Sequence, residues 1–120
     1  MSATPTCIEC VPNFSDGRRT EVVDEIVAAM VAVRGVKLLD RTSDASHNRS
    51  VVTLVGSGED LVEAAVRGAA AAARRIDLRE HSGEHPRMGA TDVIPFVPVA
   101  NTTLARCVEL ARQCGQRLGE

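Results

Sequence analysis

The sequence predicts an α+β domain in which helices cover one face of a mixed or antiparallel sheet. Three observations support this prediction. The hydrophobic period alternates between about 2 and 3.6 residues along the chain, the apolar segments are short, and turn-forming residues separate them. The chain has 120 residues, of which 44% are hydrophobic and 25% charged, a composition typical of one globular domain.

The first elements are a strand, a turn and a helix. Residues 7–12 are expected to form a short strand that ends at Pro12, and residues 13–17 are rich in the Asn, Ser, Asp and Gly of turns. Apolar residues spaced three and four apart predict a helix over residues 20–33, which Gly35 ends.

Two strands and a second helix follow. A strand is expected over residues 36–41, a polar loop over 42–48, and a third strand over 51–55, which is apolar and therefore expected to be central. The sequence Ser57-Gly-Glu-Asp60 is typical of a capped helix start, with an acid placed to bond back to the cap, and this helix should run to about Ile76.

The last elements are a loop over 77–91, a strand over 93–97 and a helix that ends near Leu118. Pro95 and Pro98 should leave the pairing of that strand incomplete, because proline offers no N–H group. Either Thr102 or Thr103 is expected to cap the helix.

The resulting order is β-α-β-β-α-β followed by an additional C-terminal helix, which predicts a ferredoxin-like sandwich. With the helices on one face, the other sheet face and the loops 13–17, 42–49 and 77–91 are left for a partner or ligand. The uncovered face also leaves self-association as a homo-oligomer open.

Composition disfavours several classes of function. The net charge of −2 and the absence of Trp and Tyr disfavour nucleic-acid binding. No apolar run approaches the 18 residues of a membrane span, and the N-terminus lacks a basic segment followed by an apolar one, so we expect a cytoplasmic protein. Cysteines at positions 7, 10, 107 and 114 lack zinc-knuckle spacing and are interpreted as reduced thiols.

The segment His81-Ser-Gly-Glu-His85 lies in a predicted loop and contains the most promising group for chemistry. It matches the pattern H-x-x-E-H of some zinc proteases, but that site needs a helix, which Gly83 and Pro86 disfavour. We therefore predict no metal. His85 is the candidate general acid/base, because the unperturbed pKa of histidine, about 6.5, suits proton transfer at neutral pH.

Two other turns carry polar residues. Asn13, Ser15 and Arg18 surround the start of a predicted helix, where free N–H groups and a positive field suit a carboxylate or phosphate. The segment His47-Asn-Arg-Ser50 precedes the central strand. At both places the alternative is that the side chains only satisfy or solvate their own turn. The predicted topology allows the two turns to lie near each other.

Several blocks of sequence stand out along the chain. They are Glu9-Cys-Val-Pro-Asn-Phe-Ser-Asp-Gly17, Leu38-Leu-Asp40, His47-Asn-Arg-Ser-Val-Val-Thr53, Val55-Gly56 and Gly83-Glu-His-Pro-Arg-Met-Gly-Ala-Thr-Asp-Val-Ile-Pro-Phe-Val-Pro98. Together these blocks resemble the N-terminal subdomain of glutamate formimidoyltransferase. They cover nearly the whole chain in the order of the family, and G-E-H-P-R-M-G-A-x-D is not a generic pattern.

The resemblance implies transfer of a formimino group from N-formimino-L-glutamate to tetrahydrofolate, the co-substrate, in histidine degradation. It implies that His85 is the catalytic acid/base and that Asn13 is the asparagine of the family's V-P-N-F-S motif. The residues expected to bind or position substrate or folate are Asn13, Ser15, Arg18, His47, Asn48, Arg49, Glu84, Arg87 and Asp92.

Family transferases have a second, similar subdomain, with the substrates bound between the two. Residues 1–120 are therefore expected to be an N-terminal subdomain, itself incomplete, that works with a C-terminal formiminotransferase subdomain in cis or in trans. Two alternatives stay open: a stand-alone or regulatory folate-binding protein without catalysis, and a purely structural interaction subunit.

Overall fold

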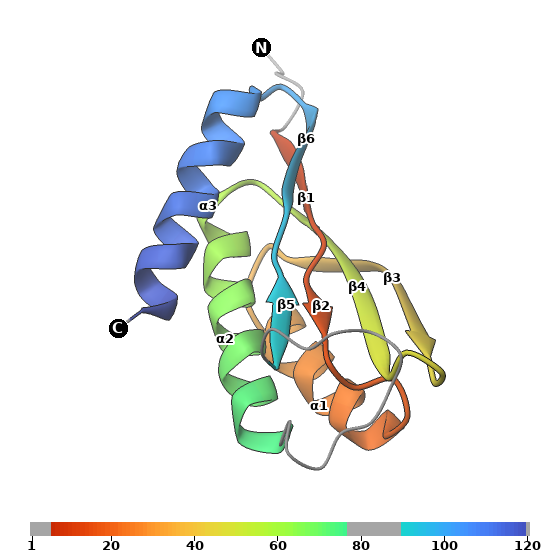
Figure 1. Ribbon diagram of the computed structural model, residues 1–120. Helices are drawn as coiled ribbons and strands as arrows, with labels where there is room; N and C mark the ends of the chain where they lie inside the picture. Colours follow the sequence, from red (N-terminus) through yellow and green to blue (C-terminus); the bar gives the residue numbers. More distant parts are fainter. Residues whose placement is uncertain (1–5, 77–89, 120) are drawn as a thin grey trace.

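The computed structural model describes residues 6–76 and 90–119, and its α+β architecture confirms the predicted fold class (Figure 1). Three helices lie against one face of a curled antiparallel sheet. The elements in chain order are β1 (Cys7–Cys10), β2 (Asn13–Phe14), α1 (Thr20–Val31), β3 (Lys37–Asp44), β4 (Arg49–Gly56), α2 (Glu59–Arg75), β5 (Thr91–Val93), β6 (Phe96–Ala100) and α3 (Leu104–Leu118).

The six strands are arranged as four, because β1 and β2 lie end to end and so do β5 and β6. β1 and β2 follow each other along the same edge of β4, with Cys10 opposite Leu54 and Asn13 opposite Val51. On the far side, β6 pairs with β1 and β5 pairs with β2. β3 pairs with the remaining edge of β4, which confirms the prediction that the apolar strand is central. This strand order is that of a ferredoxin-like fold, to which α3 adds a C-terminal helix.

The core lies between the sheet and the helices. Residues 7–14 alternate strictly, with even-numbered side chains buried and odd-numbered ones half-buried. Because neighbouring residues of a strand point to opposite faces, Ile8, Cys10 and Phe14 face the helices, and Glu9 and Asn13 face away. The helices contribute the other half of the core, largely through Val22, Val23, Ile26, Met30, Leu61, Ala64, Ala65, Ala71, Ala72 and Leu110.

The expected cap of α3 forms, and of the expected cap of α2 only the bond back from Asp60 forms. Asp60 accepts a hydrogen bond from the Ser57 N–H at 3.1 Å, although the residue at the cap position is Gly58 rather than Ser57. At the start of α3, the side chain of Thr103 accepts from the Arg106 N–H at 3.1 Å. These bonds satisfy N–H groups that a helix start leaves without intrahelical partners.

Three sequence expectations about strands were wrong in detail. Asn13–Phe14 was expected in a turn but forms β2, because β4 and β5 pair with it from both sides. The second strand continues past Arg41 to Asp44, since the polar residues there pair with the start of β4. The last strand is divided into β5 and β6, with a break before Pro95.

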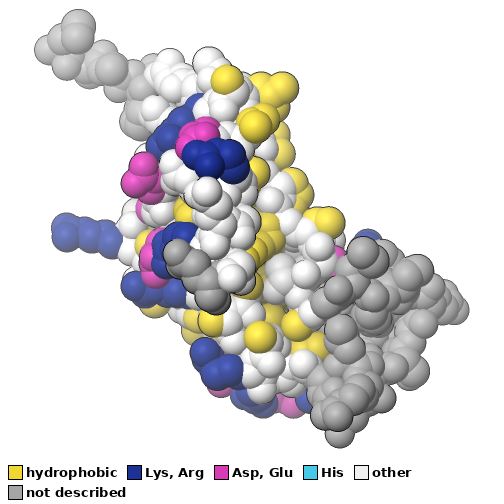
Figure 2. Space-filling model, turned by 60° about the vertical axis from the view of Figure 1, so that its left-hand side comes forward, with side chains coloured by type: hydrophobic (Ala, Val, Ile, Leu, Met, Phe, Trp, Pro, Cys, Tyr) yellow, Lys and Arg dark blue, Asp and Glu magenta, His cyan; other side chains and the backbone are white. Residues whose placement is uncertain are grey.

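The surface of the helical layer carries several ion pairs. Figure 2 shows positive and negative side chains interspersed on this side, next to a band of hydrophobic ones. Glu63 of α2 accepts from Arg67 and from Arg117 of α3, each at 2.7 Å. Surface pairs of this kind contribute up to about 1 kcal/mol each, so the Glu63–Arg117 pair stabilises the α2–α3 contact modestly. None of the helices in the described ranges is long and apolar enough to cross a membrane.

Candidate functional site

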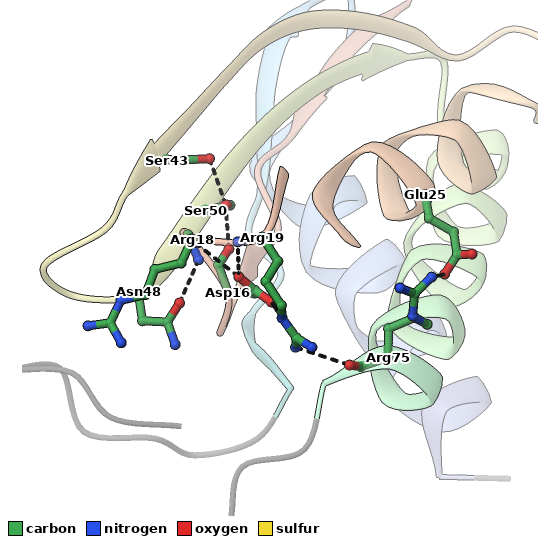
Figure 3. A network of polar contacts seen from close by, with 9 residues as sticks. Asp16, Arg18, Arg19, Glu25, Ser43, Asn48, Ser50 and Arg75 are labelled. Carbon is green, nitrogen blue, oxygen red and sulfur yellow. Dashed lines mark hydrogen bonds and ion pairs between the residues drawn. The ribbon is translucent and has the colours of Figure 1, made fainter. Parts of the chain in front are cut away.

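A buried carboxylate organises the turn between β2 and α1 (Figure 3). Oδ1 of Asp16 accepts hydrogen bonds from the backbone N–H groups of Arg18 and Arg19, at 3.0 and 2.9 Å. Oδ2 accepts from Nε of Arg19 at 2.7 Å. The Arg19 guanidinium extends further and donates to the carbonyl oxygen of Arg75 at the end of α2, at 3.1 Å. One side chain therefore ties the turn to the start of α1 and, through Arg19, to the end of α2.

The environment of Asp16 keeps it ionised. Its side chain is fully buried. Burial alone would raise the pKa of this carboxyl, but the backbone hydrogen bonds from Arg19 and Arg18, together with the hydrogen bond and charge of the Arg19 side chain, lower the pKa below its ordinary value. The start of α1 is thus already next to the negative charge of Asp16. This carboxylate accepts from backbone N–H groups that the sequence analysis had assigned to binding a ligand.

The turn between β3 and β4 packs directly on the first turn, as the predicted topology allowed. Oδ1 of Asn48 accepts from the Gly17 N–H at 2.9 Å. Oγ of Ser50 donates to the carbonyl oxygen of Asp16 at 2.5 Å. A Cβ on Gly17 would lie 2.5 Å from the carbonyl oxygen of Asp44, so only glycine permits this approach. Asn48 itself has a φ of 52°, a left-handed conformation that asparagine tolerates.

The other candidates on these turns have separate environments. Nε of Arg18 donates to the carbonyl oxygen of Ala45 at 2.6 Å, which joins the two turns. Nδ1 of His47 lies 2.7 Å from Oδ2 of Asp44, and 43% of the histidine side chain is exposed. Arg49 is half-buried at the start of β4 and makes no side-chain hydrogen bond within residues 6–76 and 90–119. Arg49 thus has a guanidinium that no described neighbour occupies.

Two more candidates meet across the sheet. Oγ of Ser15 lies 3.5 Å from Oδ1 of Asp92, and the Ser15 N–H donates to the carbonyl oxygen of Ala90 at 2.9 Å. Nδ2 of Asn13 donates to the carbonyl oxygen of Val11 at 2.9 Å. The structure therefore brings Ser15, Arg18, Asn48 and Asp92 together around one end of the sheet, while Asn13 lies one step further along its open face.

The catalytic candidate lies outside the described residues. His81, Glu84, His85 and Arg87 all belong to the range 77–89. Described residues close to both ends of this range contact the turn between β2 and α1. The carbonyl oxygen of Arg75 accepts from Arg19, and that of Ala90 accepts from the Ser15 N–H.

The cysteines and acids within residues 6–76 and 90–119 are of the residue types that can bind metals. All four cysteines are free thiols, with Cys7 half-buried and the other three buried. Burial raises the pKa of the Cys10 thiol, with the nearby Cys114 adding to the effect. In the ranges that the structure describes, His, Cys, Asp and Glu do not form a group of three or more that could hold a metal ion.

Comparison with known proteins identifies the family. Residues 7–120 match the formiminotransferase domain, N-terminal subdomain. The chain belongs to this family. The match covers every described element and includes the two turns that Asp16 and Asn48 hold together.

Relatives from distant organisms support the assignment. The chain is 51% identical to glutamate formimidoyltransferase of Streptococcus pyogenes serotype M1 over 92% of its length, and 52% identical to the protein of that name from Thermoplasma acidophilum over 94%. It is also 52% identical to formimidoyltransferase-cyclodeaminase of Sus scrofa over 94% of its length. The matched part is 37% of each microbial relative and 21% of the pig protein.

Asp16 is the residue that sequence analysis missed. It was treated as part of a turn-forming run, because Asp before Gly is common in turns for local reasons. Its role depends on burial and on the Arg19 side chain, neither of which the local pattern reveals. The available signal was the sequence Asp-Gly-Arg-Arg directly before a helix, which places an acceptor next to N–H groups that need one.

Proposed function

We propose that this chain is the N-terminal part of a glutamate formimidoyltransferase, which transfers a formimino group from N-formimino-L-glutamate to tetrahydrofolate in histidine degradation. The observation that carries the proposal is about 50% identity, over more than nine tenths of the chain, to proteins of that name. In the proposed enzyme the substrates bind between this subdomain and a C-terminal formiminotransferase subdomain.

His85 is the proposed acid/base. N5 of tetrahydrofolate attacks the formimino carbon and forms a tetrahedral centre, after which the nitrogen of glutamate leaves as an amine. The attacking amine must lose a proton and the leaving nitrogen must gain one. A single histidine can accept the first proton and return it to the second nitrogen, a contribution of about 10²–10⁴-fold in rate.

In this proposal the described residues support His85 by anchoring the chain before and after the range 77–89. The Asp16 network contacts Arg75, and the neighbouring Ser15 contacts Ala90. In the proposal, Asp92 or Glu84 orients His85 or favours the cationic formimino group. Positioning of two bound substrates contributes at best about 7–11 kcal/mol, so in this proposal anchoring of the chain on both sides of the range 77–89 matters for the rate.

Cationic side chains bind the carboxylates of the substrates in this proposal. Arg87 and Arg49 are the leading candidates, since planar guanidinium groups form paired hydrogen bonds with carboxylates. Arg18 remains a candidate, with its Nε already donating to Ala45. His47 and the uncharged Asn48 are further candidates for substrate contact, although Asn48 also accepts from the Gly17 N–H.

A turnover assay tests the proposal. The chain joined to the C-terminal half of its relatives should produce formiminotetrahydrofolate from formiminoglutamate and tetrahydrofolate. The 120-residue chain alone should have little activity, because much of each substrate would stay in water. Mixing the chain with a separately expressed C-terminal part should restore some of the activity. Failure of the joined protein to turn over both substrates, with the fold intact, would overturn the proposal.

A further inference from the structure

Glu9 occupies an unusual position on the face of the sheet that the helices leave open. In the register of the sheet it lies opposite Val55 of β4 on one side and Val97 of β6 on the other. Directly paired residues of an antiparallel sheet have side chains on the same face, with Cβ atoms about 4.5–5.5 Å apart. A carboxylate therefore stands between two valines on a strand in the interior of the sheet, where glutamate is uncommon.

This arrangement continues along the strand. Asn13 faces the same way as Glu9 and lies between Val51 and Val93 in the same manner. The open face thus has a polar stripe, Glu9 and Asn13, flanked by two apolar rows, which we call the valine rows: Val51 and Val55 on β4, and Val93 and Val97 on β5 and β6. Val93 and Val97 are 54% and 41% exposed, so this apolar surface is available for contact.

Glu9 has no partner among the described residues that would explain it structurally. It is half-buried, and no hydrogen bond or ion pair joins it to residues 6–76 or 90–119. In its own row, the nearest cation is Lys37 of β3, which pairs with Val55 and is therefore two strands away, about 10 Å. A partly desolvated carboxylate without a partner gains most from a ligand that brings hydrogen-bond donors.

From this geometry we propose that Glu9 binds the pterin ring of tetrahydrofolate, with the valine rows contacting the flat faces or edges of the ring. This inference rests on the proposed function and names the part of the co-substrate that the open face recognises. The ring presents its 2-amino group and N3–H side by side, and a carboxylate accepts two parallel hydrogen bonds from such a pair. The carbon and nitrogen atoms of the ring framework can pack against the valine rows.

Charge decides between the two substrates. Formiminoglutamate carries two carboxylates, which a site beside Glu9 would repel. Together with Glu9, Asp40 of β3 and Asp44 at its end place three acids on this face, against the two cations Lys37 and Arg49. The uncharged pterin ring has no such conflict, so Glu9 selects the ring rather than the amino-acid substrate.

The test uses the chain joined to its C-terminal half, with three variants. Glu9→Gln removes the charge at constant shape, and Glu9→Asp keeps the charge on a shorter side chain. Asp40→Asn is the matched control, since it makes the same acid-to-amide change on the same face, two strands away. Calorimetry would measure binding of 6-methyltetrahydropterin, which is the ring without its tail, p-aminobenzoyl-L-glutamate, which is the tail without the ring, tetrahydrofolate and formiminoglutamate.

Glu9→Gln should weaken binding of the bare ring and of tetrahydrofolate by about 10- to 100-fold, as expected when hydrogen bonds to a charged group are lost. Binding of the tail and of formiminoglutamate should stay within about twofold, Asp40→Asn should behave as the wild type, and Glu9→Asp should be intermediate. Thermal unfolding would show that all variants fold.

Wild-type affinity of Glu9→Gln for the ring, or an equal loss for the ring, the tail and formiminoglutamate, would overturn the inference. Failure of the joined wild-type protein to bind the bare ring would overturn it as well. Because ring binding is measured without turnover, a protein that binds the ring through Glu9 but transfers no formimino group would contradict the proposed function and leave this inference standing.

Discussion

Replacing Asp16 by Asn should destabilise the fold by about 2–3 kcal/mol at neutral pH. The buried carboxylate accepts three hydrogen bonds, two from backbone N–H groups and one from Arg19. Hydrogen bonds to charged groups contribute about 1.5–3 kcal/mol, and neutral ones about half as much. The amide oxygen of Asn can keep both backbone bonds in weaker form, but its NH₂ group cannot accept from Arg19. The Arg19 side chain is 42% exposed, so water replaces part of that loss.

The effect should depend on pH in a defined direction. The folded-state pKa of Asp16 is lowered, so the ionised carboxylate contributes stability above its unfolded pKa of about 3.9. That contribution is lost as the pH falls through the folded-state pKa. The wild type should therefore exceed Asp16→Asn by the full amount at neutral pH, and the two should converge below about pH 4.

Urea unfolding followed by circular dichroism measures both quantities. Asp24→Asn is the control, because Asp24 also contacts an arginine, Arg41, at 2.7 Å but is 59% exposed. That surface pair should contribute at most about 1 kcal/mol. If Asp16→Asn costs no more than Asp24→Asn, or if its effect is constant between neutral pH and pH 3, the buried carboxylate does not hold the turn as argued.

Three further predictions concern the turn, the histidine and the metal. Gly17→Ala should cost about 1–3 kcal/mol by thermal unfolding, because its Cβ meets the backbone at Asp44, whereas Gly115→Ala, with open space around it in α3, should be neutral or stabilising. His85→Ala in the joined protein should lower kcat by roughly 10²-fold or more with the fold intact, and near wild-type turnover would remove it from the mechanism. Elemental analysis should find no stoichiometric zinc, and one tightly held zinc per chain that His81→Ala abolishes would contradict this.

The elements of the fold were predictable because their signals are local. The three- and four-residue spacing in residues 20–33 and the alternation in 7–12 each follow from burial of one side of one element. Boundaries were less predictable where pairing overrides composition. The polar residues Thr42, Ser43 and Asp44 look like a loop, yet they extend β3 because β4 offers them backbone partners. Asn13–Phe14 also has the composition of a turn, yet it forms a strand because β4 and β5 pair with it on either side.

The proximity of the polar turns follows from the directions of the strands. It is therefore more predictable than the side-chain contacts between the turns. β2 and β4 are antiparallel neighbours, so the residues after Phe14 must lie beside the residues before Ser50. β5 is antiparallel to β2, so the chain must re-enter the sheet at the same end, beside Ser15. Three segments far apart in sequence therefore share one end of the sheet for purely topological reasons.

Which side chains in these segments can contact a ligand depends on which of them are already bonded to the protein itself. Asp16, Asn48 and Arg18 are largely used to hold the backbone, whereas Arg49 and Glu9 are not occupied by described neighbours, and that difference makes the last two the sharper candidates for contact with substrate.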